Sequence, residues 1–310
     1  MKNIIIYTHM PNFSFVDGGT VVQYYLAKLL EEYGQCVRIY TSSGIQTPNS
    51  IFSKFYNNDF PIDDNSVVIY CEGTQGNPLQ ATNVVRWMLS KLGQNVPYNW
   101  IDTWGKSELV YFFNYDADFL NNEAMICKMY KTLTCIYINP LIKNYNDPLR
   151  KGYCHSFRKS HYHKSLKIAH PPNSFEITRD HKVIDCINVF NKRKIFISYD
   201  PLTFLTIIAP MCGCISVVIK VDGISNHLEW LKTTAVYQYV KDKNIDKMYG
   251  IAYGISEIEW AINTMHLVSE QWSNILEYFK TNTIMPFLKD IEDLNSLKSS
   301  KNTIQNIFFS

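Results

Sequence analysis

Short runs of apolar residues recur along the chain, and longer amphipathic or polar stretches separate them. The runs predict buried strands at residues 3–7, 36–41, 67–71, 109–114, 133–139, 152–157, 195–198 and 215–219. Helical periodicity covers residues 19–33, with Val22, Leu26, Leu29 and Leu30 on one face. A second helix is predicted over 78–92, beginning with a proline, whose missing N–H costs little there. A long helical stretch follows at 257–281, and Pro286 is expected to bend or break it.

This alternation of strands and helices predicts an α/β fold with parallel sheets covered on both faces. Residues 144–151, which include Asn, Asp, Pro and Lys, are typical of a linker. The pattern restarts after this segment, so two Rossmann-like domains are expected, over residues 1–147 and 148–280. A chain of 310 residues is long enough for two domains of ordinary size.

The composition narrows the functional classes. Hydrophobic residues make up 46% of the chain and charged residues 19%, which suits a soluble globular protein. A net charge of +2, without any basic run, argues against nucleic-acid binding. No stretch reaches the roughly 18 apolar residues that a membrane span needs, and the N-terminal apolar segment is too short for a signal sequence. The eight cysteines form no CxxC pair and are expected as thiols in a reducing, cytoplasmic compartment.

Polar, glycine-containing loops follow several of the predicted strands, at the edge where parallel sheets bind ligands. The pair Gly18-Gly19 either lets the backbone approach a ligand at a helix N-terminus or forms a plain turn. Gly76 permits close approach of a sugar or peptide group, and Asn77 either joins that site or only caps the second predicted helix. Arg86, within that helix, is expected to form a structural ion pair or to lie at the surface, and the alternative is that it binds a ligand.

A basic pair, Arg158 and Lys159, follows the first predicted strand of the second half. Two adjacent cations at that edge either neutralise a diphosphate or form a solvated basic turn. The nearby His155, His161 and His163 have no carboxylate beside them, and the last two would point to different faces of a helix. Metal binding is therefore not expected there.

The stretch SYDPLT brings a carboxylate, a proline and hydroxyl groups to one strand-to-helix junction. Asp200 ends a strand and Pro201 can begin the next helix, with Thr203 and Thr206 in its first turns. The carboxylate of Asp200 either caps that helix or accepts hydrogen bonds from two vicinal sugar hydroxyls. Thr203 can donate to a phosphate toward which helix N–H groups also point. Ser198, at the end of the same strand, belongs to this candidate donor site.

The segment SYDPLTFLTIIAPMCGCISVVI resembles the nucleotide-binding helix of GT-B-type glycosyltransferases. In that pattern an acidic residue precedes a helix that ends in Ala-x-x-Cys-Gly before a short apolar strand. The family has two glutamates eight residues apart. Asp200 falls at the first position, whereas Ile208 falls at the second, which usually holds the ribose hydroxyls. Asp200 or Thr203 would then take over part of that role.

Further segments extend the resemblance to about residue 280. These segments have the sequences DGGTVVQYYLAKLLEEYGQCVRIY, CEGTQGNPLQATNVVRW, FRKSHYHK and YGIAYGISEIEWA. They are similar to parts of predicted glycosyltransferases of large DNA viruses and bacteria. The resemblance implies two domains facing a central cleft, with residues 281–310 as a helical segment that returns to the first domain. A viral origin would place the protein in the host cytoplasm.

The function implied by the resemblance is a metal-independent glycosyltransferase of the hexosyltransferase type. Its co-substrate would be a UDP- or GDP-linked sugar, without any other cofactor, and its acceptor a glycan or glycoprotein. The second domain would bind the donor through Arg158, Lys159, Thr203, Asp200 and Ser198. Asp200 would be the candidate catalytic residue. The acceptor side of the first domain would contain Gly18, Gly19, Gly76 and Asn77.

Two other functions stay open. An enzyme alternative on the same fold is a nucleotide-sugar epimerase or hydrolase. The non-enzymatic alternative is a degenerate sugar-binding protein, which the apolar Ile208 at the second acidic position favours. Asp116-Ala117-Asp118 has the DxD form of metal-using transferases, but it follows a strand of the first domain, the wrong half for a donor metal. Turnover of the donor with and without an acceptor would separate these functions.

Overall fold

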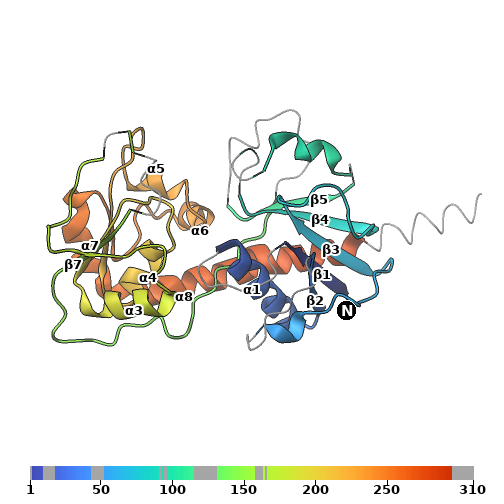
Figure 1. Ribbon diagram of the computed structural model, residues 1–310, viewed down its shortest axis with the longest axis horizontal. Coiled ribbons are helices and arrows are strands. Elements are labelled where there is room, and N and C mark those ends of the chain that lie inside the picture. Colours follow the sequence, from blue (N-terminus) through green and yellow to red (C-terminus); the bar gives the residue numbers. More distant parts are fainter. Residues whose placement is uncertain are drawn as a thin grey trace, which may run out of the picture. The chain divides into compact units, whose positions relative to one another are not determined.

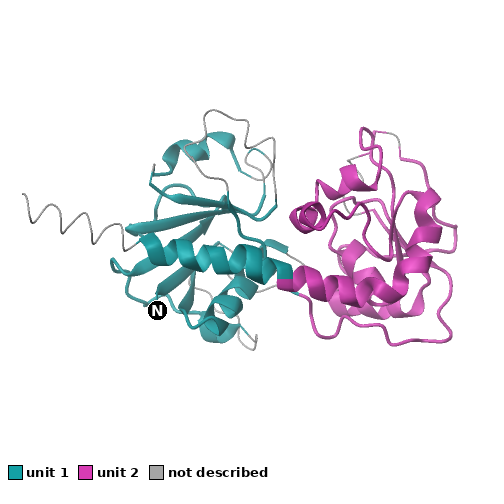
Figure 2. Ribbon diagram, turned by 180° about the vertical axis from the view of Figure 1, so that it is seen from behind, with its two compact units in different colours: residues 1–137, 278–310 teal, residues 138–277 magenta. Residues whose placement is uncertain are grey.

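The computed structural model describes residues 2–9, 18–42, 52–90, 93, 96–105, 107–114, 131–157, 163–164 and 166–294. The chain forms two compact units (Figure 2). Unit 1 contains residues 1–137 and 278–310, and unit 2 contains residues 138–277. The domain boundaries expected from the sequence, at 147/148 and 280/281, stay predictions.

Unit 1 is built on a parallel sheet of six strands in the order β2-β1-β3-β4-β5-β6 (Figure 1). The strands are β1 (Asn3–Thr8), β2 (Cys36–Thr41), β3 (Ser66–Cys71), β4 (Asn83–Met88), β5 (Leu109–Phe112) and β6 (Lys131–Thr132). Helix α1 (Gly18–Glu32) connects β1 to β2, and short 3-10 helices are present at η1 (Ser53–Phe55) and η2 (Tyr98–Thr103).

The two faces of the unit 1 sheet are covered differently. Ile4, Ile6 and Trp87 belong to the cluster that α1 and the chain after Tyr278 bury on one face. That later segment contributes Phe287 and Ile291, and the Tyr111 hydroxyl donates a hydrogen bond to the Asp290 carboxylate, so the end of the chain closes this core. Side chains of loops and of η2 cover the opposite face. They include Phe60, Ile62, Leu79, Ile101 and Trp104.

Unit 2 contains a parallel sheet of five strands in the order β11-β10-β9-β7-β8. The strands are β7 (Tyr153–Ser156), β8 (Phe175–Glu176), β9 (Ile195–Ser198), β10 (Ile215–Val218) and β11 (Ile251–Tyr253). Its helices are α3 (Val183–Lys192), α4 (Leu205–Met211), α5 (His227–Leu231), α6 (Tyr237–Asp242), α7 (Ile258–Thr264) and α8 (Val268–Phe279), whose last two residues belong to unit 1. Helices α3 and α4 pack side by side over one face of the sheet (Figure 1).

The helix expected over residues 78–92 is wrong, because this part of the chain contains strand β4. All six residues of β4 are buried between β3 and β5. The β-branched Val84 and Val85 suit a strand in the middle of a sheet. Pro78 lies in the loop before the strand and begins no helix.

Two other element predictions need correction. The strand expected at 133–139 is absent, and the edge strand β6 ends at Thr132, although Leu133 and Cys135 are buried in the core. Pro286 does not break the helical stretch, since residues 285–294 are helical, and a bend there stays a prediction. A π-helical turn at Lys280–Ile284 comes directly before it, and there the Met285 N–H donates to the Lys280 carbonyl. The i−4 ladder is thus already interrupted where proline cannot donate.

Across the described residues, no helix is both long and apolar enough to span a membrane. No disulfide bond joins the cysteines in the described part of the chain.

Candidate functional site

Open parallel sheets bind ligands beyond the carboxyl ends of their strands, at the point where the strand order reverses. In unit 1 the chain passes from β1 to β2 on one side and then to β3 on the other. In unit 2 it passes from β7 to β8 and then to β9 on the opposite side. The switch points therefore lie between β1 and β3 and between β7 and β9.

Aromatic rings fill the switch point of unit 2. The rings of Phe157 and Tyr199, which follow β7 and β9, stack with centroids 4.5 Å apart. Beside them the imidazoles of His155 and His170 are parallel at 3.6 Å. The His155 Nδ1 lies 2.9 Å from the Ser174 hydroxyl. Burial and the neighbouring His170 lower the pKa of His155 below its ordinary value.

The Tyr199 hydroxyl holds the chain between β7 and β8. It accepts hydrogen bonds from the backbone N–H groups of Ala169 and His170, at 2.7 and 3.2 Å. The same hydroxyl lies 2.8 Å from the His170 Nδ1. The His163 Nε2 donates to the Tyr199 carbonyl at 2.9 Å. One buried tyrosine thus fixes three points of this connection.

Asp200 and Thr203 shape the turn into α4. The Asp200 side chain is buried, and its Oδ1 accepts a hydrogen bond from the Leu202 N–H at 2.9 Å. The Ser198 hydroxyl donates to the Asp200 carbonyl at 2.7 Å. Thr203 lies before the helix, not in its first turn, and its hydroxyl accepts from the Leu205 N–H at 3.3 Å. The turn-forming role of Asp200 is thus present, and its role in donor binding stays a prediction.

The structure describes only some of the other residues considered for the donor site. Arg158, Lys159 and His161 lie outside the described residues. Ile208 is buried in the core between the sheet and α3. The second acidic position of the GT-B pattern is therefore an apolar core position in this chain.

A second polar network lies beside the carboxyl end of β11. The buried His227 donates from Nδ1 to the Glu257 Oε2 at 2.7 Å and accepts from the Met248 N–H on Nε2 at 3.3 Å. Burial lowers the pKa of His227. For Glu257, burial acts in the opposite direction, but hydrogen bonds from the Tyr253 N–H and from His227 outweigh it and lower the pKa.

An exposed histidine marks the switch point of unit 1. His9 follows β1, and its Nε2 lies 3.0 Å from the hydroxyl of Thr74, which follows β3. The Ser42 hydroxyl, after β2, lies 3.5 Å from the His9 Nδ1. A Cβ added at Gly73 would stand 3.8 Å from the His9 ring. Three neighbouring strands thus bring an imidazole and two hydroxyl groups to one edge.

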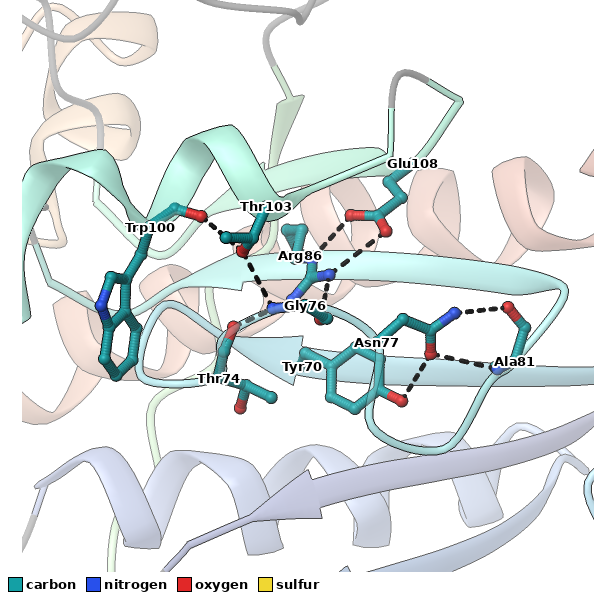
Figure 3. A network of polar contacts seen from close by, with 9 residues as sticks. All are labelled: Tyr70, Thr74, Gly76, Asn77, Ala81, Arg86, Trp100, Thr103 and Glu108. Atoms are coloured by element: carbon teal, nitrogen blue, oxygen red, sulfur yellow. Dashed lines mark hydrogen bonds and ion pairs between the residues drawn. The ribbon is translucent and has the colours of Figure 1, made fainter.

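The loop after β3 is held by the side chain of Arg86 (Figure 3). The guanidinium is fully buried and pairs with Glu108 through Nε and Nη2, at 2.6 and 3.2 Å. It also donates to the carbonyl groups of Thr74 and Gly76, at 3.1 and 2.5 Å. The sequence placed Arg86 in a structural ion pair or at the surface, and the buried pair with Glu108 is of the first kind.

The residues expected on the acceptor side have mainly local contacts in the structure. Gly18 is exposed at the start of α1, followed by Gly19. The Gly76 N–H donates to the Thr103 hydroxyl at 2.9 Å. Asn77 caps no helix: its amide closes a turn by bonding to both backbone groups of Ala81, at 2.8 and 3.0 Å. The role of these four residues in acceptor binding stays a prediction.

Sequence reasoning missed His9, Thr74, Phe157 and Tyr199. Each lies within three residues of the carboxyl end of a strand beside a switch point. A histidine directly after the first apolar strand was the one available signal. The pairing of β1 with β3, which gives that histidine its meaning, is not visible in the order of elements along the chain.

Within the described residues, no group of three or more His, Cys, Asp or Glu side chains is placed to hold a metal ion. Asp116 and Asp118 lie outside those residues. Metal independence therefore stays a prediction.

No protein-family model matches the chain, and no curated protein matches its sequence. Among solved structures, sucrose-phosphate synthase from Thermosynechococcus elongatus is similar, with a TM-score of 0.50 at 9% identity over 97% of this chain and 100% of that chain. An alpha-glucosyltransferase in complex with UDP gives a TM-score of 0.48 at 10% identity, over 94% of this chain and 100% of its own. The first similarity confirms the expected α/β fold with two parallel sheets, of the GT-B type.

Proposed function

We propose that the chain is a glycosyltransferase that moves a sugar from a nucleotide-activated donor to a hydroxyl group of an acceptor. The observation that carries the proposal is the two-sheet fold, shared along nearly the whole of both chains with an enzyme named for making sucrose phosphate. Polar and aromatic side chains at both switch points, where such sheets bind ligands, support it.

In this proposal unit 2 binds the donor, a UDP- or GDP-linked hexose. Arg158 and Lys159 neutralise the diphosphate, so the leaving group needs no metal. Ser198, Asp200 and Thr203, at and after the carboxyl end of β9, contact the sugar or its phosphate. The bond between the sugar and the diphosphate breaks, and the nucleoside diphosphate leaves with the electron pair of that bond.

Unit 1 binds the acceptor, a glycan or glycoprotein, at the edge that carries Gly18, Gly19, Gly76 and Asn77. The exposed His9 is suited to accept a hydrogen bond, and then the proton, of the attacking hydroxyl. The bond between the acceptor oxygen and the sugar forms as that proton leaves.

A second candidate function is sugar binding without turnover. Ile208, an apolar core residue where the GT-B pattern has its second carboxylate, favours it. The two functions differ in one measurable property, because only the enzyme releases nucleoside diphosphate.

Donor binding and turnover test the proposal. We expect UDP- or GDP-sugars to bind by calorimetry and to release nucleoside diphosphate without an added divalent cation. Arg158→Ala removes a charge-assisted contact worth about 1.5–3 kcal/mol, or about tenfold to a hundredfold in affinity. Asp200→Asn keeps the size and the turn-forming oxygen but removes the charge, so weaker binding would show a direct role in holding the donor.

Lys192→Ala is the matched control, because it removes an exposed charge at the end of α3, before β9, and hence at the opposite edge of the sheet. Its affinity for the donor should equal that of the wild type. Wild-type affinity in Arg158→Ala and Asp200→Asn as well would place the donor elsewhere. Binding without any release of nucleoside diphosphate, with a panel of acceptors, would favour the sugar-binding protein.

A further inference from the structure

Arg86 is a charged residue in the middle of a sheet. It lies on β4 between β3 and β5, and its side chain has no exposed surface. A buried charge is costly unless it is paired and its donors are satisfied. Glu108 provides the pairing, and the guanidinium lies over the rings of Tyr70 and Trp104, at 5.0 and 5.1 Å from their centroids.

The remaining donors of Arg86 bind a loop. Nη1 reaches the Thr74 carbonyl, and Nη2 reaches the Gly76 carbonyl as well as Glu108. On the other side of Gly76, its N–H donates to the Thr103 hydroxyl, which itself donates to the Trp100 carbonyl (Figure 3). The loop after β3 is thus fixed by side chains from β4 and η2 at the carbonyl groups of Thr74 and Gly76 and at the Gly76 N–H.

Thr74 connects this clamp to His9. Its carbonyl is bound by Arg86, whereas its hydroxyl, on a side chain that is almost wholly buried, contacts the His9 Nε2 at 3.0 Å. A rotation of the loop would therefore move that hydroxyl away from the imidazole. The guanidinium makes four hydrogen bonds from donors fixed in one plane, whereas a lysine ammonium has only three donors on a single nitrogen.

We propose that Arg86, paired with Glu108, is a positioning residue that orients the His9 imidazole through Thr74 for a hydroxyl-bearing acceptor at the unit 1 switch point. Arg86 has no exposed surface, so it acts through the loop and not by contact with the acceptor. The part of the proposal that concerns the acceptor rests on the proposed function, whereas the coupling of Arg86 to His9 is a property of the folded chain.

The first test observes His9 in the full chain without any substrate. Imidazole nitrogen resonances are recorded by NMR and assigned with His9→Gln. We expect Arg86→Lys and Thr74→Val to shift the His9 resonances in the same direction, and the double variant to shift them no further than either alone. Non-additivity of this kind is the mark of two residues that act through one contact.

Arg38→Lys is the matched control. Arg38 lies on β2, donates to the Val37 carbonyl at 2.7 Å and lies 5.3 Å from the Phe60 ring centroid, so it has the same kinds of contact in another part of the sheet. It should leave the His9 resonances in place. Glu108→Gln keeps the size and a hydrogen-bond acceptor, and we expect a smaller shift in the same direction, so the proposal stays testable should Arg86→Lys fail to melt cooperatively.

The second test uses turnover. Misplacement of a reacting group costs about a hundredfold, so Arg86→Lys should lower the rate of transfer to the acceptor by up to that factor. The KM for the donor should stay unchanged, because the proposed donor site lies in unit 2. A folded Arg86→Lys or Glu108→Gln variant with wild-type His9 resonances would overturn the proposal. If the variants show the NMR coupling but the wild-type chain turns over no nucleotide sugar, the proposed function alone is overturned.

Discussion

Three buried tyrosines, Tyr70, Tyr199 and Tyr253, lie at or near the carboxyl ends of strands, and their hydroxyl groups contact loops. Each hydroxyl accepts a hydrogen bond from the backbone N–H of a residue in a nearby loop. Burial raises the pKa of Tyr70 to about 12 and also raises that of Tyr253, so both hydroxyls stay protonated and able to donate. Neutral hydroxyl groups thus order the loops of the ligand-binding edges without adding charge to them.

Gly250, directly before β11, combines a left-handed backbone with a crowded site. Its φ is +70°, and an added Cβ would stand 2.7 Å from Val268 and 2.8 Å from Pro210. We expect Gly250→Ala to lower the free energy of unfolding by about 1–2 kcal/mol for the backbone and about 1–3 kcal/mol for overpacking. Gly223→Ala is the control, since Gly223 has a φ of +87° with nothing within 4 Å. Urea unfolding of both variants should show the larger loss at Gly250, and equal losses would contradict the crowding.

Two histidines make unit 2 sensitive to acid. The pKa values of His155 and His227 are lowered from an ordinary value of 6.5, so the unfolded chain binds protons that the folded chain does not. Their contribution to stability is present above that pH and is lost as the pH falls below it. Glu257, whose pKa is also lowered, loses its contribution only below its ordinary value of 4.5. We therefore expect the urea midpoint to fall between pH 7 and pH 5.

The control for this prediction is the double variant His155→Gln, His227→Gln. Its stability is lower at neutral pH, but its urea midpoint should change much less between the two pH values. A wild-type midpoint that rises toward pH 5, or an equal fall in the double variant, would show that other groups set the acid response.

At the scale of elements, apolar runs predicted most strands because buried parallel strands are apolar on both faces. The segment of strand β4 indicates a helix in the sequence because Pro78 precedes it and proline is common at helix starts. Arg86 in the same segment also hid a fully buried strand, since the ion pair and the aromatic rings that make its burial possible come from β3 and from residues after β4. Long-range partners of this kind are not visible in a local pattern.

The candidate sites also differ in whether a local pattern predicts them or the pairing of distant strands creates them. The sequence predicts a candidate site at Asp200, Ser198 and Thr203 because a strand-to-helix junction is a local feature, and their role in donor binding stays a prediction. His9 and Tyr199 gain their positions from pairs of strands that are distant in the chain, β1 with β3 and β7 with β9. The sequence therefore predicts which loops carry chemistry, and the sheet order predicts which of those loops meet.

At the scale of the whole molecule, the two units have separate cores. The clusters around α1 and around η2 contain residues of unit 1, whereas those around α3, α4 and α7 contain residues of unit 2. Unit 1 is discontinuous in the chain, because its core is completed by residues that follow unit 2. Unit 2 is formed by a single continuous segment.

This difference predicts how fragments of the chain behave. Residues 138–277 contain a complete sheet and its helices, so we expect this fragment to fold alone and melt cooperatively. Residues 1–137 lack Ile284, Phe287 and Ile291, which lie in the largest part of the unit 1 core. Removal of each such side chain costs about 2–5 kcal/mol, and the sum reaches the whole stability of an ordinary domain, about 5–15 kcal/mol. We therefore expect residues 1–137 to be unfolded by circular dichroism and NMR, and to fold when residues 278–310 are supplied as a second chain. A cooperative melt of residues 1–137 alone would show that the end of the chain only covers a core that forms without it.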